Sequence, residues 1–339
     1  MDNLKHAYQK GYIEIGASGY THPILPLLTE DLVYAQIELD IEVLKEYIGE
    51  PTWFWFPEGV VDQKALKVLF EKSPKLIAVI PDTALERKNF SGFVRIKHKN
   101  GKEQKAIICN SLLKDIMLNA EYYPQKPSYV LKSLNWSIAQ KMVYNGEKFF
   151  EVLQTLGGNS HVLVRDWENK GSKDGLVSIN AKGLDIKGLV ELGAEFKLPS
   201  EVGWSKARLI NINEMKPGSW EVDAPEDDPF LYWWPNERSE RWQNLDSERK
   251  NWVLKWESLI KDYNKKFSMV AEKAGGIEKS LENKIVKEKI KGSLPALMSC
   301  IPWHFLAKPE WKPDPGFSEL AWKNIVVPAK EQFWQSNKR

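Results

Sequence analysis

Two acidic residues, Glu58 and Asp166, each come at or near the end of a short apolar run of the sequence, PTWFWFPE and HVLVRD. Cleavage of a glycosidic bond needs two carboxyl groups in different protonation states. An ionised one attacks or stabilises the sugar carbon, and a protonated one gives a proton to the leaving oxygen. Apolar surroundings raise the pKa of a carboxyl group, whereas hydrogen bonds and cations lower it. The two acids are therefore a candidate catalytic pair whose surroundings would divide these roles.

The segments around Glu58 predict alternating helices and strands. Apolar residues recur at helical spacing over 31–48 and 61–72, and Gly49 follows the first of these segments as a stop signal. Short apolar runs at 53–56 and 76–82 are typical of buried strands of a parallel sheet. This alternation predicts an α/β fold, in which residues at the carboxyl ends of the strands converge on one rim.

The next part of the chain departs from this alternation and then returns to it. Residues 93–109 form two alternating segments around Asn100-Gly101, which predicts a hairpin that leaves the main sheet. Helical stretches are expected near 111–120 and 136–156. The run at 161–166 then predicts another buried strand, with Asp166 at its carboxyl end.

From about residue 205 the sequence becomes rich in Pro, Asp and Trp without a clear period. A helix is expected after it, and a more charged second helix at 279–291. The first of these helices places four apolar residues on one face: Leu245, Trp252, Trp256 and Ile260. We therefore expect an α/β portion at 1–205 and a mainly helical region at 206–339.

The composition argues against several classes of partner. Lys and Arg number 48 and Asp and Glu 46, so the net charge of +2 gives no electrostatic reason to expect nucleic acid or an anionic membrane. No run of about 18 apolar residues is present, and the first residues lack a signal-peptide pattern. Cys109 and Cys300 have no CxxC spacing. A soluble, cytoplasmic chain is expected.

The histidines give no indication of a metal site. His98, His161 and His304 lack the HxH or HExxH spacing of metal ligands, so neither a metal nor another cofactor is expected.

Aromatic residues are unusually frequent, with 15 Trp and 11 Tyr, many of them beside Pro, Asn or charged residues. Indole and phenol rings stack on sugar rings and on nucleobases, and the near-neutral charge favours sugars. Trp220, Trp233 and Trp234 are candidates for sugar stacking. Packing in the core is the alternative for each of them.

Several motifs occur in order along the chain: GYIEIGASGYTHPILPLL at 11–28, Gln36-Ile37, Gly49-Glu50-Pro51, FWFPEGVVD at 54–62, PSEV at 199–202, PGSW at 217–220 and SCIPWHFLAKPEW at 299–311. Together they resemble the catalytic domain of glycoside hydrolase family 57. The family includes α-amylases, amylopullulanases, 4-α-glucanotransferases and branching enzymes. The resemblance implies an incomplete (β/α)7-type barrel with a mainly helical C-terminal region, and a retaining enzyme that acts on an α-glucan or oligosaccharide.

The same resemblance implies roles for individual residues. Glu58 in WFPE falls on the family's nucleophile and Asp166 in DWEN on its general acid/base, with the two carboxyl groups about 5–5.5 Å apart. His22 in THPILP and Glu14 in GYIE fall on positions near the sugar site. His22 could instead be a hydrogen-bonded structural residue, and Glu14 an outward-facing strand residue.

The two candidate catalytic acids also have simpler interpretations. Glu58 could cap the helix that follows it, because a helix N-terminus favours negative charge. Asp166 could be a loop acid paired with Arg165 or Lys170, and Glu168 is a competing candidate for its role.

One departure from the family affects the expected function. The family begins with a strand that carries a His-Gln-Pro motif, which this sequence lacks. A second polypeptide could supply the strand, as in a split enzyme, or the chain could be a fragment. It could also be a non-catalytic carbohydrate-binding or regulatory subunit that keeps the family groove. A carbohydrate deacetylase is a third possibility, but the Asp and His set for its metal is not found.

Overall fold

The computed structural model describes the positions of most of the chain, which are residues 2–86, 91–111, 162, 186–220, 237, 240–298, 320 and 322–335. The chain forms two compact units. Unit 1 comprises Met1–Ala78, Pro217–Ser219 and Ala224–Arg339, and unit 2 comprises Val79–Lys216 and Trp220–Asp223. The division expected near residue 205 stays a prediction.

The first strands of unit 1 are parallel. Strand β1 (Gly16–Ala17) pairs with β2 (Trp53–Trp55), and the hydrogen-bonded order continues to β3 (Ile77–Pro81), which begins in this unit. The register places Gly16 opposite Trp53. A Cβ atom at Gly16 would lie 2.2 Å from Cε3 of Trp53, so the indole ring occupies the space where any other residue would carry its side chain. This close approach helps to fix the pairing of β1 with β2.

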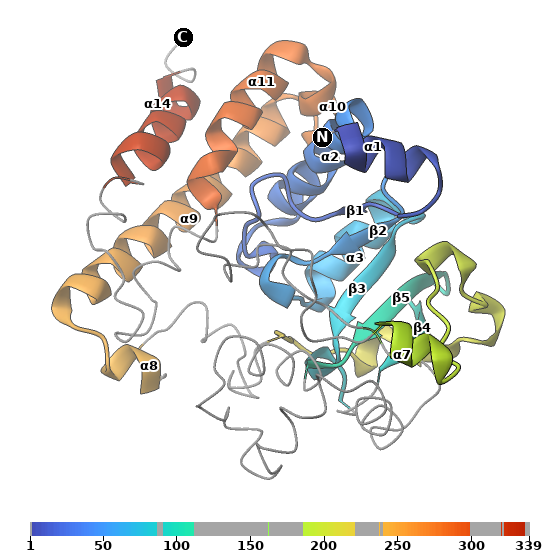
Figure 1. The fold of residues 1–339 in the computed structure, drawn as a ribbon. Helices are drawn as coiled ribbons and strands as arrows, with labels where there is room; N and C mark the ends of the chain where they lie inside the picture. The colour runs from blue at the N-terminus through green and yellow to red at the C-terminus, as the bar shows by residue number, and fades with distance from the viewer. Residues whose placement is uncertain are drawn as a thin grey trace. The chain divides into compact units, whose positions relative to one another are not determined.

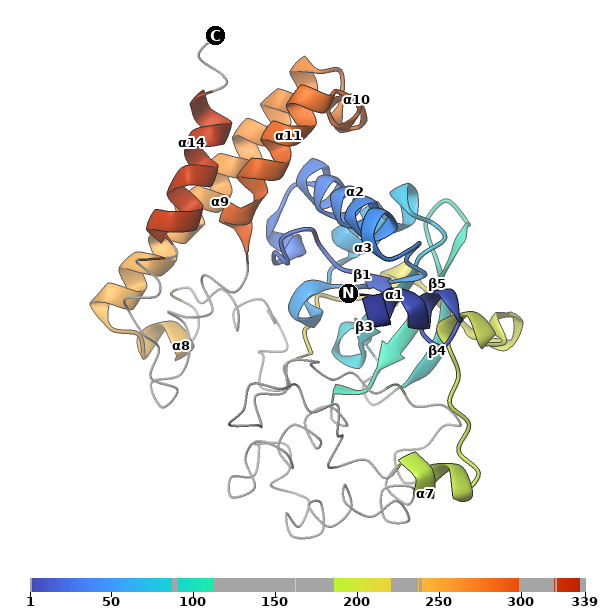
Figure 2. The same cartoon turned by 45° about the horizontal axis from the view of Figure 1, so that its top comes forward.

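Two helices of unit 1 pack against each other beside these strands (Figure 2). They are α2 (Glu30–Tyr47) and α3 (Gln63–Lys72), which confirms the two helices predicted in this part of the chain. Their facing sides are apolar, and Val33, Ile37 and Leu66 are fully buried. The short helix α1 (Asp2–Gln9) precedes them and contains no buried residue.

The described residues in the later part of unit 1 are mainly helical, as Figure 1 shows. The helices described there are α8 (Glu240–Gln243), α9 (Ser247–Lys273), α10 (Ile277–Glu282), α11 (Lys284–Ser293) and α14 (Val327–Gln335). The predicted helix is confirmed as α9, in which Trp256 and Ile260 are buried and Trp252 is partly buried. The expectation that Leu245 lies on its face is wrong, because Leu245 precedes the N-cap Asp246. Helices α9, α11 and α14 run beside one another (Figures 1 and 2), and α11 contacts α14 directly.

The single helix predicted at 279–291 is wrong, because two helices, α10 and α11, occupy this segment. Asn283 separates them with an extended backbone. Its side-chain oxygen accepts hydrogen bonds from the amides of Ile285 at 3.1 Å and Val286 at 3.2 Å. An asparagine in this role is an N-cap, so it starts a new helix instead of continuing the old one.

Unit 2 contains the predicted hairpin. Strands β4 (Gly92–Lys97) and β5 (Glu103–Cys109) are antiparallel, and Gly101 in their turn has a positive φ of 81°. The expectation that the hairpin leaves the sheet is wrong, since the order is β3-β5-β4-β6, with β6 (Arg208–Asn211) parallel to β4. The alternating residues of the hairpin are buried, so it packs as part of the sheet. Helix α7 (Ile186–Glu191) also belongs to unit 2.

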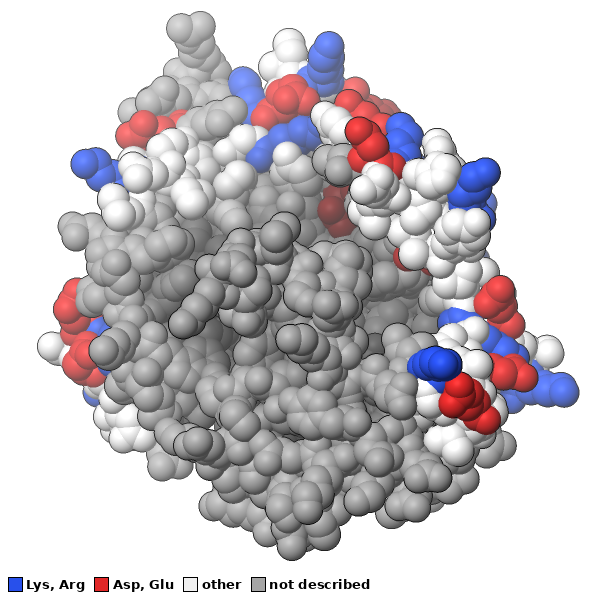
Figure 3. Space-filling model, in the orientation of Figure 1, with Lys and Arg blue, Asp and Glu red and all other residues white. Residues whose placement is uncertain are grey.

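The described residues thus form a mixed α/β structure with parallel and antiparallel pairs. The elements predicted at 111–120, 136–156 and 161–166 lie outside the described residues, apart from the isolated positions Ser111 and Val162. None of the helices in the described ranges is long and apolar enough to cross a membrane. On the face drawn in Figure 3, the described basic and acidic side chains are interspersed.

Candidate active site

The candidate residues His22 and Glu58 follow neighbouring parallel strands. His22 comes after β1 and Glu58 after β2. The two segments remain adjacent beyond the paired residues, because the hydroxyl of Ser18 donates a hydrogen bond to the carbonyl of Trp55 at 2.9 Å. Both side chains therefore lie at the carboxyl edge of the pair, where active groups of parallel sheets gather.

The side chains of His22 and Glu58 face each other. Nδ1 of His22 lies 3.8 Å from Oε1 of Glu58, and the Glu58 side chain is 18% exposed whereas that of His22 is 48% exposed. At this distance a protonated imidazole would favour the ionised carboxylate by its charge. The carboxylate is thus largely enclosed by the protein but retains contact with solvent beside an exposed imidazole.

Both residues have an unusual backbone conformation. Glu58 has φ of 55° and ψ of 21°, and His22 has φ of 53°; they are the only residues other than glycine with positive φ in the described part of the chain. This left-handed region is unfavourable for residues with a Cβ atom. Such outliers persist where the surrounding structure imposes them, and they cluster at functional sites.

The turn around Glu58 is held by backbone hydrogen bonds. In the short helix η2 (Pro57–Gly59), the amide of Gly59 donates a hydrogen bond to the carbonyl of Phe56 at 2.8 Å, and the amide of Val60 donates one to the carbonyl of Pro57 at 3.0 Å. Val61 and Gly218 exchange backbone hydrogen bonds of 3.0 Å in both directions. The PGSW segment that resembles a family motif therefore begins beside the loop of the candidate nucleophile, within unit 1.

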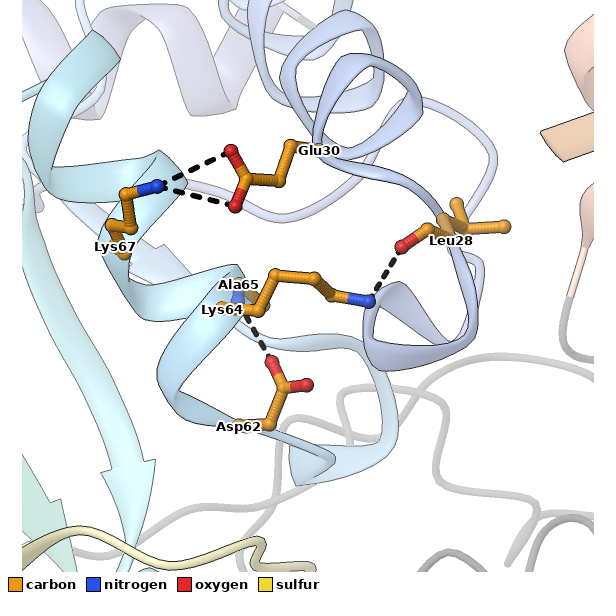
Figure 4. Close-up of polar contacts among 6 residues, drawn as sticks. All are labelled: Leu28, Glu30, Asp62, Lys64, Ala65 and Lys67. Atoms are coloured by element: carbon orange, nitrogen blue, oxygen red, sulfur yellow. Dashed lines mark hydrogen bonds and ion pairs between the residues drawn. The ribbon is translucent and has the colours of Figure 1, made fainter. Parts of the chain in front are cut away.

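The structure excludes the interpretation of Glu58 as the cap of the following helix. Figure 4 shows that Asp62 is the N-cap of α3, with its Oδ1 atom accepting a hydrogen bond of 2.7 Å from the amide of Ala65. Burial raises the pKa of Asp62, and this hydrogen bond acts against that rise. Because Asp62 caps the helix, the position of Glu58 needs another explanation.

A lysine joins the start of α3 to the segment after His22. Nζ of Lys64 donates to the carbonyls of Pro26 at 2.7 Å and Leu28 at 2.6 Å, and Figure 4 shows the second of these contacts. Burial lowers the pKa of Lys64. An exposed pair of Lys67 with Glu30 lies beside it. Lys64 therefore ties the segment that follows His22 to the helix that follows Glu58.

Two residues that support this edge, Asp40 and Gln36, are not among the site residues predicted from the sequence. The carboxylate of Asp40 on α2 accepts a hydrogen bond of 2.6 Å from the amide of Ser18, and burial raises the pKa of Asp40. Gln36, one turn earlier, is fully buried and contacts the turn before His22. The available signal was a polar residue at an inward position of a predicted amphipathic helix.

Glu14 lies at the other end of the strand pair. Its Oε2 atom accepts a hydrogen bond of 2.7 Å from the hydroxyl of Thr52, and both residues precede the paired strands. The structure therefore gives Glu14 a contact at the amino edge of β1 and β2 and does not bring it to His22 and Glu58 along the strands. Its contact with a sugar stays a prediction.

The roles of the remaining candidates stay predictions. Trp220 is 8% exposed and belongs to unit 2, whereas His22 and Glu58 belong to unit 1. Asp166, Trp233 and Trp234 lie outside the described residues, so the separation of the Glu58 and Asp166 carboxyl groups stays a prediction.

The histidines outside this pair show no metal-binding arrangement in the ranges that the structure describes. His98 is buried, with Nε2 at 3.3 Å from Oε1 of Gln104, while His161 and His304 lie outside those ranges. Within the same ranges, no group of three or more His, Cys, Asp or Glu residues is placed to hold a metal ion.

A family model matches the first part of the chain. A profile of glycosyl hydrolase family 57 matches residues 1–140, which include Glu14, His22 and Glu58. No curated protein matches the sequence.

Three solved structures of low identity are similar to the chain. The α-amylase AmyC from Thermotoga maritima is 13% identical with a TM-score of 0.49, and the match covers 99% of this chain and 70% of that one. The 4-α-glucanotransferase from Thermococcus litoralis is 13% identical with a TM-score of 0.46, covering 96% and 45%. The family 57-type branching enzyme from Pyrococcus horikoshii is 13% identical with a TM-score of 0.41, covering 98% and 74%. The chain thus spans less than half of the glucanotransferase.

Proposed function

We propose that the chain acts on α-glucans as a retaining glycoside hydrolase or glucanotransferase, because residues 1–140 match the glycosyl hydrolase family 57 model. The observation that carries the proposal is the position of Glu58. Its carboxylate is largely enclosed, lies at the carboxyl edge of β2 in a left-handed turn, and has His22 at 3.8 Å. Helix capping does not explain this carboxylate, since Asp62 caps α3.

In this proposal Glu58 is the nucleophile. Its ionised carboxylate attacks the anomeric carbon, the bond to the leaving oxygen breaks, and a covalent glycosyl-enzyme forms. Asp166 gives a proton to the leaving oxygen and then takes one from the incoming water or sugar hydroxyl. In this mechanism the carboxyl groups of Glu58 and Asp166 are about 5–5.5 Å apart. Water as acceptor gives hydrolysis, and a sugar hydroxyl gives transfer.

His22 supports the nucleophile in this scheme. An imidazole that is protonated beside Glu58 favours the ionised carboxylate needed for attack. The 48% exposure of its side chain also leaves it accessible to a sugar hydroxyl. Glu14, Trp220, Trp233 and Trp234 are further proposed sugar contacts, and the α/β part is proposed to be an incomplete (β/α)7-type barrel.

The test uses the purified chain, alone and with any polypeptide that co-purifies with it. Maltooligosaccharides are the substrate, and NMR records the anomeric form of the first product. We expect α-configured product from the wild type and at least about a 10³-fold loss of kcat in Glu58→Gln. Glu46→Gln, which removes an exposed carboxylate of α2, is the matched control and should keep full activity.

Azide gives a second test of the nucleophile. Glu58→Ala leaves room for a small anion, which would attack the sugar carbon and yield a glycosyl azide of inverted configuration. Full activity in Glu58→Gln would refute the assignment. If calorimetry shows binding of maltooligosaccharides without turnover by either preparation, the chain is a carbohydrate-binding or regulatory subunit instead.

A further inference from the structure

A buried glutamine of α2 contacts the turn that carries His22. Gln36 is 0% exposed and Thr21, which precedes His22, is 8% exposed. Oε1 of Gln36 accepts a hydrogen bond of 2.9 Å from the amide of Thr21, and its Nε2 donates one of 2.9 Å to the hydroxyl of Thr21. The side chain of Gln36 thus binds one residue of the turn through two different atoms.

One arrangement of the protons is compatible with the shorter contacts of this network. When the amide of Gln36 donates to the Thr21 hydroxyl, that hydroxyl has its own proton left to donate. It reaches the carbonyl of Leu294 in η9 (Leu294–Leu297) at 3.2 Å. The alternative contact of the hydroxyl with Oε1 of Gln36 is longer, at 3.3 Å, and would leave the carbonyl of Leu294 without this bond. Buried hydrogen bonds that share the same groups in this way hold the side chain of Gln36 and the hydroxyl of Thr21 in one geometry.

The backbone of the same turn is held as well. The amide of Tyr20 donates to the backbone carbonyl of Gln36 at 3.0 Å, and the amide of His22 donates to Gly19 at 2.7 Å. The left-handed conformation of His22 is therefore imposed by a turn that is hydrogen-bonded on the side of α2.

We propose that Gln36 is a positioning residue that fixes the turn from Gly19 to His22 and thereby holds His22 against Glu58. The proposal rests on the proposed function of Glu58. Gln36 does not touch the substrate in this scheme, since it is fully buried, and it acts through Thr21 on the direction of the imidazole. Gln36 therefore supports the site from α2, which is distant in sequence from the ends of both strands.

The first experiment measures amide hydrogen exchange in Gln36→Leu. Leucine keeps most of the buried volume but removes both side-chain hydrogen bonds. We expect exchange of the Thr21 amide to rise at least about tenfold, because its acceptor is lost. The Tyr20 amide should keep its protection, since its acceptor is the backbone carbonyl of residue 36. Equal protection of Thr21 in both proteins would overturn the proposal whether or not the chain cleaves glucans.

The second experiment measures kinetics in the four proteins of a double-mutant cycle. Gln36→Leu should lower kcat by about 10- to 100-fold with little change in KM, as a small misplacement of a site group does. In a His22→Ala background the same change should lower kcat by less than about twofold, because the residue it positions is gone. An equal loss in both backgrounds would overturn the positioning role.

A matched control separates positioning from loss of stability. Asn264 of α9 also makes two side-chain hydrogen bonds, both partly buried, accepting from the amide of Thr29 at 2.9 Å and donating to the carbonyl of Leu27 at 2.9 Å. Asn264→Leu should therefore also destabilise the protein but leave kcat within about twofold of the wild type. A loss of kcat equal to that of Gln36→Leu would show a general effect and would also contradict the proposal. Absence of glucan turnover in the wild type would refute the proposed function, and the exchange of Thr21 would then decide the positioning of the turn.

Discussion

The backbone of Glu58 predicts an unusual order of stabilities for two substitutions. With φ of 55° and ψ of 21°, residue 58 is in the left-handed region, where a residue with a Cβ atom is unfavourable by about 1–2 kcal/mol. Glycine avoids this cost, but its greater freedom in the unfolded chain offsets about 0.4–1 kcal/mol. Both variants lose the same carboxylate. The free energy of unfolding of Glu58→Gly should therefore exceed that of Glu58→Ala by about 0.5–1 kcal/mol.

An exposed position in a regular helix gives the opposite order. Lys67 lies in the middle of α3, and its contact with Glu30 is lost equally when alanine or glycine replaces it. There glycine should be less stable than alanine by about 1 kcal/mol, because it pays more conformational entropy and no strain is relieved. The pair of substitutions at position 67 is thus a control for the pair at position 58.

Urea titration followed by tryptophan fluorescence measures these differences. The four variants are compared as two pairs, so that only the change from alanine to glycine enters each difference. The sign at position 58 should be opposite to the sign at position 67. If Glu58→Gly is less stable than Glu58→Ala by about 1 kcal/mol, the left-handed conformation at Glu58 is refuted, together with the inference that a functional constraint maintains it.

Three further predictions concern the elements around this site. Asp62→Ala should lower the free energy of unfolding by about 0.5–2 kcal/mol in a urea titration, because the N-cap of α3 is lost, and an unchanged value would contradict the cap. Burial raises the folded-state pKa of Asp40, so its contribution to stability is fully present below the unfolded pKa of about 3.9 and is lost as the pH rises through the folded value. Asp40→Asn keeps an oxygen that can accept from the amide of Ser18, so this variant should gain stability relative to the wild type as the pH rises from 4 to 7. Thermal unfolding across this range should show a growing difference between the melting temperatures of the two proteins. Gly16→Ala should be strongly destabilising because Cβ would overlap Trp53, and the added change Trp53→Ala should recover part of the loss in melting temperature.

Much of the first part of the fold follows from local sequence signals. Helices α2 and α3 carry apolar residues at a regular helical spacing, and the amide of Gly49 closes the end of α2 with a hydrogen bond of 2.8 Å to Leu44. Strand β3 is buried at every residue, as a continuous apolar run predicts. These signals are local, so one sequence is enough to detect them.

Other features depended on contacts that a single sequence does not display. The split at Asn283 required weighing a capping side chain against a helical pattern that continues through it. The place of the hairpin in the sheet depends on which strand lies beside β5, and β6 was not predicted because its pairing with β4 is its main support. Strand pairing between distant segments is a tertiary property, so the period of a segment does not determine it.

The candidate site shows the same division between local and distant information. Glu58 was found because it ends an apolar strand, and His22 because it lies in a segment that resembles a family motif. The contact between them, and the support from Gln36, needed the paired strands and α2 in place. Backbone preference favours Gly or Asn where φ is positive. The two described non-glycine residues with positive φ in this chain are instead His22 and Glu58. A sequence that accepts strain at two facing residues, and buries a glutamine to hold one of them, is consistent with selection for what these side chains do and not for stability at those positions.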